Sequence, residues 1–533
     1  MKKVTIYFAI TLFLFIPLNV IALYIDTQIP SSSAGSTGLF TRIHIPETTR
    51  YASGAPIVIW LPGGNSTGGV LPRSEFSRFG FITIQFNFPG GLNSGGTYDN
   101  RGPNCILALR DIIKFATGQI TNTNGQTLKQ LISPKIPMYS NVGLVGSSHG
   151  GNISIVTAGY YGSEIQLAWI CNWESPVGDG MPGAEAGARN PQNGNPWTNP
   201  AYNDTTGIFD YSKLKYSDTL RLTPTTFIGG FYFDINNNGV PNRGTDFIIN
   251  GFGSSGKQYT STTLVQEAVN RGIFPAVPPS HIASLSQTQD FWKWRNGDLW
   301  IDSVRKKLSN LMFVIIATDT DHVQSAKDHP HVYIQYEHFR TAGIRFVRLN
   351  PDRAYVEYCL GYTQPAAKDN DAFTLYTRLT IRDKFQPEII ADSINSAASV
   401  CELADRTCAN NITPNLNSII YCNTTGIQNI KNNIPNEIQL FQNYPNPFNP
   451  GTKIRFDIPT PQSPLSERGN KGGFVKLIVY DILGREVATL VNEQLKLGTY
   501  EVDWNAAGFT SGVYFYRIQV ENYSETKKVI LLR

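Results

Sequence analysis

The chain has 533 residues, of which 41% are hydrophobic, 12% aromatic and only 16% charged. This composition excludes an intrinsically disordered chain and a coiled coil, because both classes need a much larger share of charged residues. The 45 Lys and Arg residues against 41 Asp and Glu residues give a formal net charge of +4. So small an excess, with no cluster of basic residues, predicts no nucleic-acid partner. We therefore expect a globular protein of more than one domain.

Residues 1–22 have the pattern of a secretion signal peptide. Lys2 and Lys3 precede an apolar run from Val4 to Leu18, and the small residue Ala22 suits a cleavage site. The apolar run is shorter than the ~20 residues that a membrane-spanning helix needs, although an N-terminal anchor is the alternative. We expect cleavage after residue 22, export, and no integral membrane segment in the mature chain.

The six cysteines fit an oxidising compartment, but the chain is too large to be a disulfide scaffold. Cys401, Cys408 and Cys422 lie close enough in sequence for one bridge among them. Cys171 lies in an apolar run, which favours a buried thiol.

Short apolar runs alternate with helical stretches up to about Tyr355. The runs cover residues 57–61, 81–86, 142–145, 167–171, 313–317 and 344–347. Such buried strands separated by helices predict an α/β fold with a doubly wound, mostly parallel sheet and helices on both faces. About 140 residues separate the runs at 167 and 313, which is too long for one crossover. We expect an inserted cap there, over about residues 178–305.

From about Ile434 the sequence changes to short alternating strands joined by turns, which predicts a C-terminal all-β sandwich. Four segments in this region closely resemble the C-terminal sorting domain of type IX secretion cargo: 442–450, 480–487, 512–517 and 525–533. The resemblance implies a sorting domain over 434–533, the type IX secretion machinery as a partner, and delivery across the outer membrane into the medium or onto the cell surface. Residues 366–433 are then a helical or irregular extension and linker. A carbohydrate-binding module is the alternative for the β domain.

The pattern Gly-x-Ser-x-Gly occurs twice, around Ser66 and around Ser148. Only Ser148 follows an apolar strand directly and precedes a helix, which is the context of a nucleophile elbow. The dipole of that helix and the backbone N–H of His149 would stabilise a developing oxyanion. A glycine-rich packing turn, or a site that has lost its activity, is the alternative.

The order of strand, elbow and helix resembles the α/β-hydrolase superfamily over about residues 35–355, and we expect the hydrolase domain to span residues 23–365. The resemblance implies a second oxyanion donor in the loop after an earlier strand, here at Gly63 and Gly64. It also implies an acid after a later strand, where Asp321 matches best and Asp319 lies beside it. Glu174 is the rival acid, because some members place the acid after the preceding strand.

The histidine departs from the family pattern, because no histidine follows the last predicted strand. His322, His329 and His331 lie in an earlier loop that should reach the same edge of the sheet as Ser148. Any of them could act as the base, since geometry rather than chain order defines a triad. Surface histidines that cap a helix, with no triad at all, are the alternative.

The cap contains a segment that resembles a calcium-binding loop, with oxygen-bearing residues at alternate positions and a glycine in sixth place. The candidate ligands are Asp234, Asn236, Asn238, Val240, Asn242 and Asp246. Because the twelfth residue is Thr245 rather than Glu, an Asn/Gly-rich turn is the alternative. We expect calcium, where bound, to be structural.

Together these patterns predict a secreted serine hydrolase that cleaves carboxylic esters through an acyl-enzyme on Ser148 and requires no cofactor. The predicted catalytic residues are Ser148, Asp321 and either His322 or His331. A peptidase acting on peptide substrates is the enzymatic alternative. A hydrolase fold that has lost its activity and acts as a surface binding protein is the alternative from another class.

Overall fold

The computed structural model describes residues 24–532 except for fourteen segments. Those segments are 52, 181, 223–225, 318–325, 327, 353, 357–392, 413–418, 421–427, 432–436, 460–473, 496–497, 507–508 and 521–522. The predicted signal peptide and most of the predicted extension lie outside the described residues.

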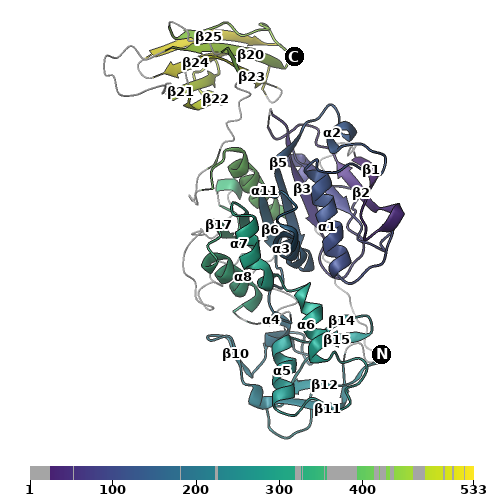
Figure 1. Cartoon of the computed structure of the whole chain (residues 1–533). Helices are drawn as coiled ribbons and strands as arrows, with labels where there is room; N and C mark the ends of the chain where they lie inside the picture. The colour runs from purple at the N-terminus through teal and green to yellow at the C-terminus, as the bar shows by residue number, and fades with distance from the viewer. Residues whose placement is uncertain are drawn as a thin grey trace, which may run out of the picture.

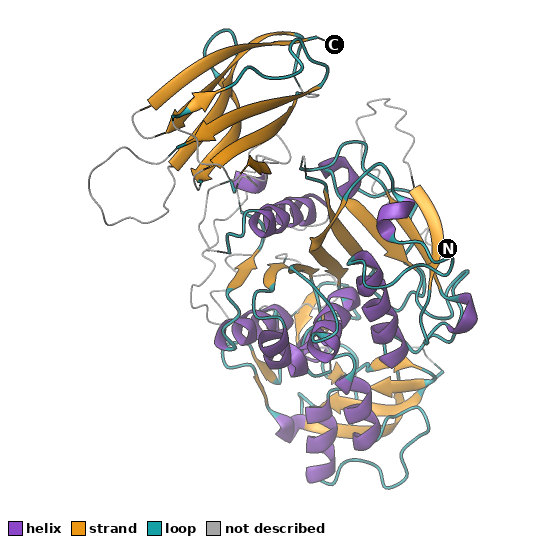
Figure 2. Cartoon of the chain, turned by 45° about the horizontal axis from the view of Figure 1, so that its top comes forward, coloured by secondary structure: helices purple, strands orange, loops and turns teal. Residues whose placement is uncertain are grey.

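An eight-stranded sheet forms the centre of the N-terminal part (Figures 1 and 2). Its strands, in spatial order, are β1 (Tyr24–Ile29), β2 (Leu39–His44), β4 (Ile82–Phe86), β3 (Ala55–Leu61), β5 (Pro137–Ser147), β6 (Trp169–Trp173), β16 (Met312–Ile316) and β17 (Phe346–Leu349). From β4 to β17 all neighbours are parallel, while β1 and β2 are antiparallel. This is the strand order of the α/β-hydrolase sheet, and it confirms the predicted mostly parallel sheet. Strands β1 and β2 were not predicted.

Helices cover both faces of this sheet, because successive side chains of the buried strands point to opposite faces. On one face lie α1 (Pro103–Ala116), α3 (His149–Tyr161), α7 (Ile301–Lys307) and α8 (Pro330–Thr341). On the other face lies α11 (Ser393–Cys408), with the short helix η2 (Phe76–Phe79). Each face has its own hydrophobic cluster, and the sheet separates the two.

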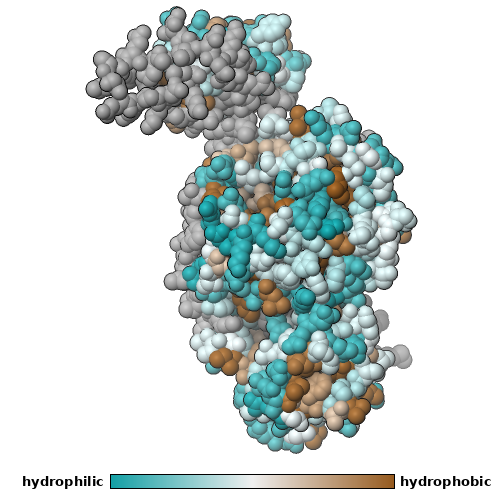
Figure 3. Space-filling model, viewed as in Figure 1, coloured by the Kyte–Doolittle hydropathy of each residue, from teal (hydrophilic) through white to brown (hydrophobic). Residues whose placement is uncertain are grey.

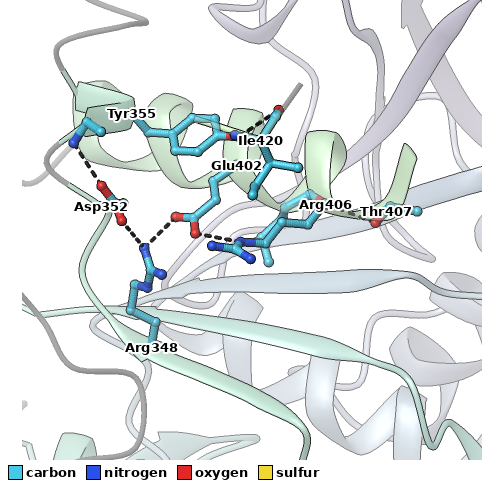
Figure 4. Close-up of polar contacts among 9 residues, drawn as sticks. Arg348, Asp352, Tyr355, Glu402, Arg406, Thr407 and Ile420 are labelled. Atoms are coloured by element: carbon cyan, nitrogen blue, oxygen red, sulfur yellow. Dashed lines mark hydrogen bonds and ion pairs between the residues drawn. The ribbon is translucent and has the colours of Figure 1, made fainter. Parts of the chain in front are cut away.

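A buried ionic network ties α11 to the sheet (Figure 4). The Arg348 guanidinium on β17 donates to Asp352 and to Glu402, and Glu402 also accepts from Arg406 at 2.7 Å. The side chains of Arg348, Glu402 and Arg406 are wholly buried. Glu402 therefore neutralises two buried cations at once and fixes α11 against the sheet. Cys408, which ends α11, is in a disulfide bond whose partner lies outside the described residues, and Cys171 is a buried thiol.

Residues 182–293, within the predicted cap, form small sheets and helices with a hydrophobic cluster of their own (Figure 1). These elements are α4 (Pro182–Ala186), β7 (Gly187–Arg189), β8 (Pro196–Thr198), β9 (Tyr202–Asn203), β10 (Ile208–Phe209), η3 (Tyr211–Lys213), β11 (Leu214–Arg221), β12 (Ile228–Phe233), β13 (Phe247–Ile248), β14 (Phe252–Ser254), β15 (Lys257–Tyr259), α5 (Thr262–Asn270) and α6 (Leu285–Lys293). Short connecting helices elsewhere are η1 (Gly35–Thr37), α2 (Leu128–Leu131) and η4 (Gly297–Trp300).

The C-terminal part consists of two four-stranded sheets with one shared hydrophobic cluster. The first sheet contains β18 (Gln428–Lys431), β23 (Gly498–Asn505), β20 (Gly451–Ile458) and β19 (Gln439–Leu440). The second contains β22 (Glu486–Gln494), β21 (Phe474–Tyr480), β24 (Gly512–Val520) and β25 (Tyr523–Leu531). All buried members of the cluster come from residues 440–531, so this part has its own core.

Among the residues that the structure describes, no helix is both long enough and apolar enough to cross a membrane. On the face of the molecule shown in Figure 3, hydrophobic residues occur in patches between hydrophilic ones.

The network around Glu402 predicts a large stability effect. Glu402→Gln keeps the size of the side chain but leaves Arg348 and Arg406 as buried cations without their shared carboxylate, so the free energy of unfolding should fall by about 3 to 5 kcal/mol. Urea unfolding followed by tryptophan fluorescence measures this, since Trp169 lies in the same cluster as α11. In the control Glu337→Gln, which breaks the half-exposed pair with Arg340, the loss should stay below about 1 kcal/mol. Equal losses in the two variants would contradict the role given to the buried network.

Candidate active site

Ser148 occupies a strained turn between β5 and α3. β5 ends at Ser147 and α3 begins at His149, so a single residue joins strand to helix. The backbone of Ser148 has φ 47° and ψ −120°, a conformation that costs a non-glycine residue of order 1 to 3 kcal/mol. Its N–H donates to the carbonyl of Trp173 at 2.7 Å, and its own carbonyl accepts from Gly151 at 2.9 Å. These bonds hold the turn that the Gly-x-Ser-x-Gly pattern predicts.

The glycines around Ser148 are needed for close packing of the backbone. A Cβ on Gly146 would lie 2.5 Å from the Cα of Gly151, and a Cβ on Gly150 would lie 2.5 Å from the carbonyl oxygen of Leu61. Both distances are too short for any side chain. The pattern around Ser148 thus reflects the approach of α3 to β5 and to the end of β3.

Glu174 and His331 form a hydrogen-bonded pair beside this turn. Glu174 follows β6 directly, and His331 is the second residue of α8. His331 Nε2 lies 3.0 Å from Glu174 Oε2, and the two side chains are 0% and 10% exposed. Because Trp173, the residue before Glu174, accepts the hydrogen bond from the Ser148 N–H, the acid and the serine lie at the same edge of the sheet. Glu174, the rival acid, therefore contacts a candidate histidine.

Other predicted members of the triad are placed differently. Asp319, Asp321 and His322 fall in 318–325, outside the described residues. His329 precedes α8 with a left-handed backbone at φ 42°, and its ring centroid lies 6.0 Å from that of His331. No hydrogen bond among the described residues joins the Ser148 hydroxyl to a histidine.

Glu174, His329 and His331 also lie close enough together to bind one metal ion. Each offers one ligand atom, and these atoms lie within 4.8 Å of one another. Two imidazoles and one carboxylate are a ligand set that suits a catalytic zinc ion with one open position. The three residues can thus serve either as acid and base or as metal ligands.

Gly63, one of the predicted oxyanion donors, lies next to Ser148. We call residues 62–66, which follow β3, the glycine loop. A Cβ on Gly63 would lie 3.1 Å from the Cβ of Ser148, so this residue contacts the serine directly, and Gly64 is exposed with φ 61°. Ser66, the second match to the serine pattern, lies at the end of the same loop, where its hydroxyl bonds to the Gly68 backbone.

The side chain of His149 is buried between the sheet and the cap. Its ring stacks on Phe252 of β14 with 4.8 Å between ring centroids and 8° between ring planes. Burial lowers the pKa of His149 to about 3, and Arg101 and Arg295 add to this shift. The imidazole is therefore neutral at physiological pH, and its contact links the elbow to the cap.

Arg101 was missed by the sequence analysis. It precedes α1, its side chain is fully buried, and it donates hydrogen bonds into the glycine loop. Nothing in the sequence around Arg101 predicts this contact, because the carbonyls to which it donates are 35 to 39 residues away in sequence.

The predicted calcium ligands form a tight loop between β12 and β13. The Asp234 carboxylate accepts from the backbone N–H groups of Asn238 and Gly239, and the Asp246 carboxylate accepts from those of Ile235 and Asn242. Asn236 and Asn238 accept backbone bonds within the loop, and Val240 is exposed. Asp234 and Asp246 are 3% and 0% exposed, and no Lys, Arg or His among the described residues forms an ion pair with either. Two buried carboxylates without a counter-charge are costly, which fits a bound cation.

Comparison with known proteins identifies the C-terminal part. Residues 442–532 match the family described as "Secretion system C-terminal sorting domain". The chain therefore carries a sorting domain of the type IX secretion system, which marks secreted or cell-surface proteins. PorZ, a surface component of that system in Porphyromonas gingivalis, is similar over 18% of this chain and 11% of its own, with 22% identity and a TM-score of 0.12. No curated protein matches the sequence.

Two esterase-related structures are similar to the N-terminal part. Carboxyl esterase 2 from the mycorrhizal fungus Tuber melanosporum covers 61% of this chain and 75% of its own, with 11% identity and a TM-score of 0.29. An esterase of the bacterial hormone-sensitive lipase family covers 61% and 87%, with 11% identity and a TM-score of 0.22.

We propose that the Asp234–Asp246 loop binds a structural calcium ion. Binding of this ion should measurably stabilise the folded protein. With calcium at about 100 times its dissociation constant, binding to the folded state alone adds about 2.7 kcal/mol, so removal of calcium by EGTA should lower the melting temperature. Asp246→Asn should abolish this dependence, whereas Asp218→Asn, at an exposed position on β11, should preserve it. A melting temperature that EGTA does not change in the wild type would leave only an Asn/Gly-rich turn.

Proposed function

We propose that residues 23–365 form a secreted serine hydrolase that cleaves carboxylic esters through an acyl-enzyme on Ser148. The observation that carries this proposal is the strained turn of Ser148 at the sheet edge where Glu174 pairs with His331. A serine lifted on a tight turn at a helix N-terminus, beside a histidine that a carboxylate orients, is the arrangement that activates a hydroxyl as a nucleophile.

In the proposed mechanism His331 takes the proton of the Ser148 hydroxyl as that oxygen attacks the ester carbonyl. Because His331 Nε2 contacts Glu174, the other ring nitrogen, Nδ1, would take the serine proton. Glu174 fixes the orientation of the ring and stabilises the imidazolium that forms.

The tetrahedral intermediate carries its negative charge on the former carbonyl oxygen. The backbone N–H of His149, at the start of α3, and an N–H of the glycine loop at Gly63 or Gly64 are the donors proposed for that charge. His331 then returns the proton to the leaving alcohol, and a water molecule activated by the same histidine releases the acid from Ser148.

The competing acid and base are Asp321 and His322. Both follow β16 in sequence and belong to the segment outside the described residues; as acid and base they would leave Glu174 and His331 as a structural pair. A peptidase would use the same nucleophile and oxyanion donors, so relative rates on an aryl ester and the matching aryl amide separate the two activities.

Kinetics of single variants test the assignment. Ser148→Ala should lower kcat for a simple aryl ester by about 10⁴-fold to 10⁶-fold, because only the oxyanion donors and binding contacts remain. His331→Gln should cause a loss of similar size and Glu174→Gln a loss of at least about 10²-fold, while His322→Gln and Ser66→Ala should retain near wild-type rates. A large loss in His322→Gln with none in His331→Gln would move the base to His322. A wild type that is inactive on all such substrates would favour a surface binding protein.

A second candidate function is metal-dependent hydrolysis, which the clustering of Glu174, His329 and His331 supports. In that case the three residues would hold a zinc ion, whose chemistry is to activate a water molecule and polarise a carbonyl. Ser148 would then not carry an acyl group.

Chelation separates the two mechanisms. In buffer with excess calcium, 1,10-phenanthroline should leave ester hydrolysis unchanged if Ser148 is the nucleophile, as should its non-chelating isomer 1,7-phenanthroline. Loss of activity with the 1,10 isomer alone, restored by added zinc, would favour the metal mechanism.

A further inference from the structure

We propose that Arg101 is a positioning residue that holds the glycine loop against Ser148 and adds positive potential where the oxyanion forms. This inference rests on the proposed function, because it concerns how the oxyanion donors of that reaction are kept in place.

The Arg101 side chain bridges the two ends of the glycine loop. Its Nη2 donates to the carbonyl oxygen of Pro62 at 3.0 Å and to that of Ser66 at 3.2 Å. These carbonyls flank residues 63–65, which contain the proposed donors, and Gly64 and Asn65 are exposed. A single guanidinium nitrogen thus pins both sides of an otherwise exposed turn.

The pinned end of the loop also contacts the nucleophile helix. A Cβ on Gly150 would lie 2.9 Å from the Pro62 carbonyl oxygen, so this oxygen lies against the first turn of α3. Gly63, the next residue, contacts Ser148. A shift of the Pro62 carbonyl would therefore move the loop relative to the serine, and misplacement of catalytic groups by about 1 Å can cost 10²-fold in rate.

Arg101 is a buried cation that no described carboxylate neutralises. Its side chain is 0% exposed and lies over the ring of Phe88, 4.0 Å from the ring centroid. Neither Nε nor Nη1 makes a hydrogen bond of good geometry among the described residues, although the neutral Tyr98 hydroxyl lies near the guanidinium. An unneutralised buried charge is costly, and a role that offsets this cost is to stabilise negative charge formed nearby during the reaction.

A second arginine, from the end of the cap, supports the turn that carries Arg101. The backbone of Arg101 is left-handed, at φ 67°, and so is that of Asn100, at φ 55°. Arg295, which follows α6, donates through Nε to the Asn100 carbonyl at 2.7 Å and through Nη2 to the Asp99 carbonyl. Asp99 in turn accepts from the backbone N–H groups that begin α1. Contacts therefore run from the cap through Arg295 and Arg101 to the glycine loop.

The test compares Arg101→Met and Arg101→Lys with Arg50→Met in the full chain. Arg50 is the control, because its side chain is only 10% exposed but pairs with Asp405 on the opposite face of the sheet. We expect Arg101→Met to lower kcat for the aryl ester about 10²-fold with KM changed less than about 3-fold. Arg101→Lys keeps the charge but not both hydrogen bonds to the glycine loop, so its kcat should lie between those of the wild type and Arg101→Met. Arg50→Met should lower thermal stability and leave kcat unchanged.

Two further readouts distinguish positioning from general destabilisation. Hydrogen exchange of peptides covering residues 62–69 should be faster in Arg101→Met and unchanged in Arg50→Met. Low millimolar guanidinium should restore part of kcat in Arg101→Ala and none in Ser148→Ala.

An active wild type in which folded Arg101→Met and Arg101→Lys keep full kcat overturns the inference and leaves the proposed function intact. Equal fractional losses in Arg50→Met would also overturn it. A wild type as inactive as Ser148→Ala overturns the inference and the proposed function together.

Discussion

The strained, positive-φ backbone of Ser148 is the constraint on which the site depends. A serine does not keep this conformation unless its surroundings determine it, and here the bond from its N–H to Trp173 and the close approach of α3 to β3 and β5 do so. The same bond places β6 beside the serine, which brings Glu174 to the site. The strain is thus maintained by contacts with β3, β5 and β6 of the central sheet.

The region inserted between β6 and β16 contacts the site through two side chains. Phe252 stacks on His149, the residue after the proposed nucleophile, and Arg295 supports the turn that carries Arg101. Both contacts act on groups proposed to stabilise the oxyanion. Because the sorting domain has a core of its own, that domain and the proposed site are stabilised by separate sets of interactions.

Local sequence signals predicted the parts of the site that local geometry determines. The apolar strand, the tight Gly-x-Ser-x-Gly turn and the following helix lie within about twenty residues, so Ser148 and the adjoining strands and helix could be placed from sequence. Strands β1 and β2 were missed because they are short, antiparallel strands at one side of the sheet, with mixed polar and apolar residues. The sorting domain was predicted because its four segments are specific to the family.

Contacts between distant segments could not be predicted in the same way. Glu174 and His331 are 157 residues apart, and only the parallel arrangement of β5, β6 and β16 brings them to one edge. Sequence therefore ranked Asp321 above Glu174 by family position, and the described structure supports Glu174 by its contact with a histidine. Arg101 was missed for the same reason, since its hydrogen bonds are to backbone carbonyls that leave no mark on the sequence of the glycine loop.

The central claim is that Ser148 is an activated nucleophile, and covalent labelling tests it without knowledge of the substrate. The full chain would be treated with a fluorophosphonate, and the adduct located by mass spectrometry of the digested protein. The account predicts one adduct per chain, located on Ser148, with no adduct after heat denaturation or in Ser148→Ala. An unlabelled wild type, or an adduct on Ser66 or another residue, would contradict it.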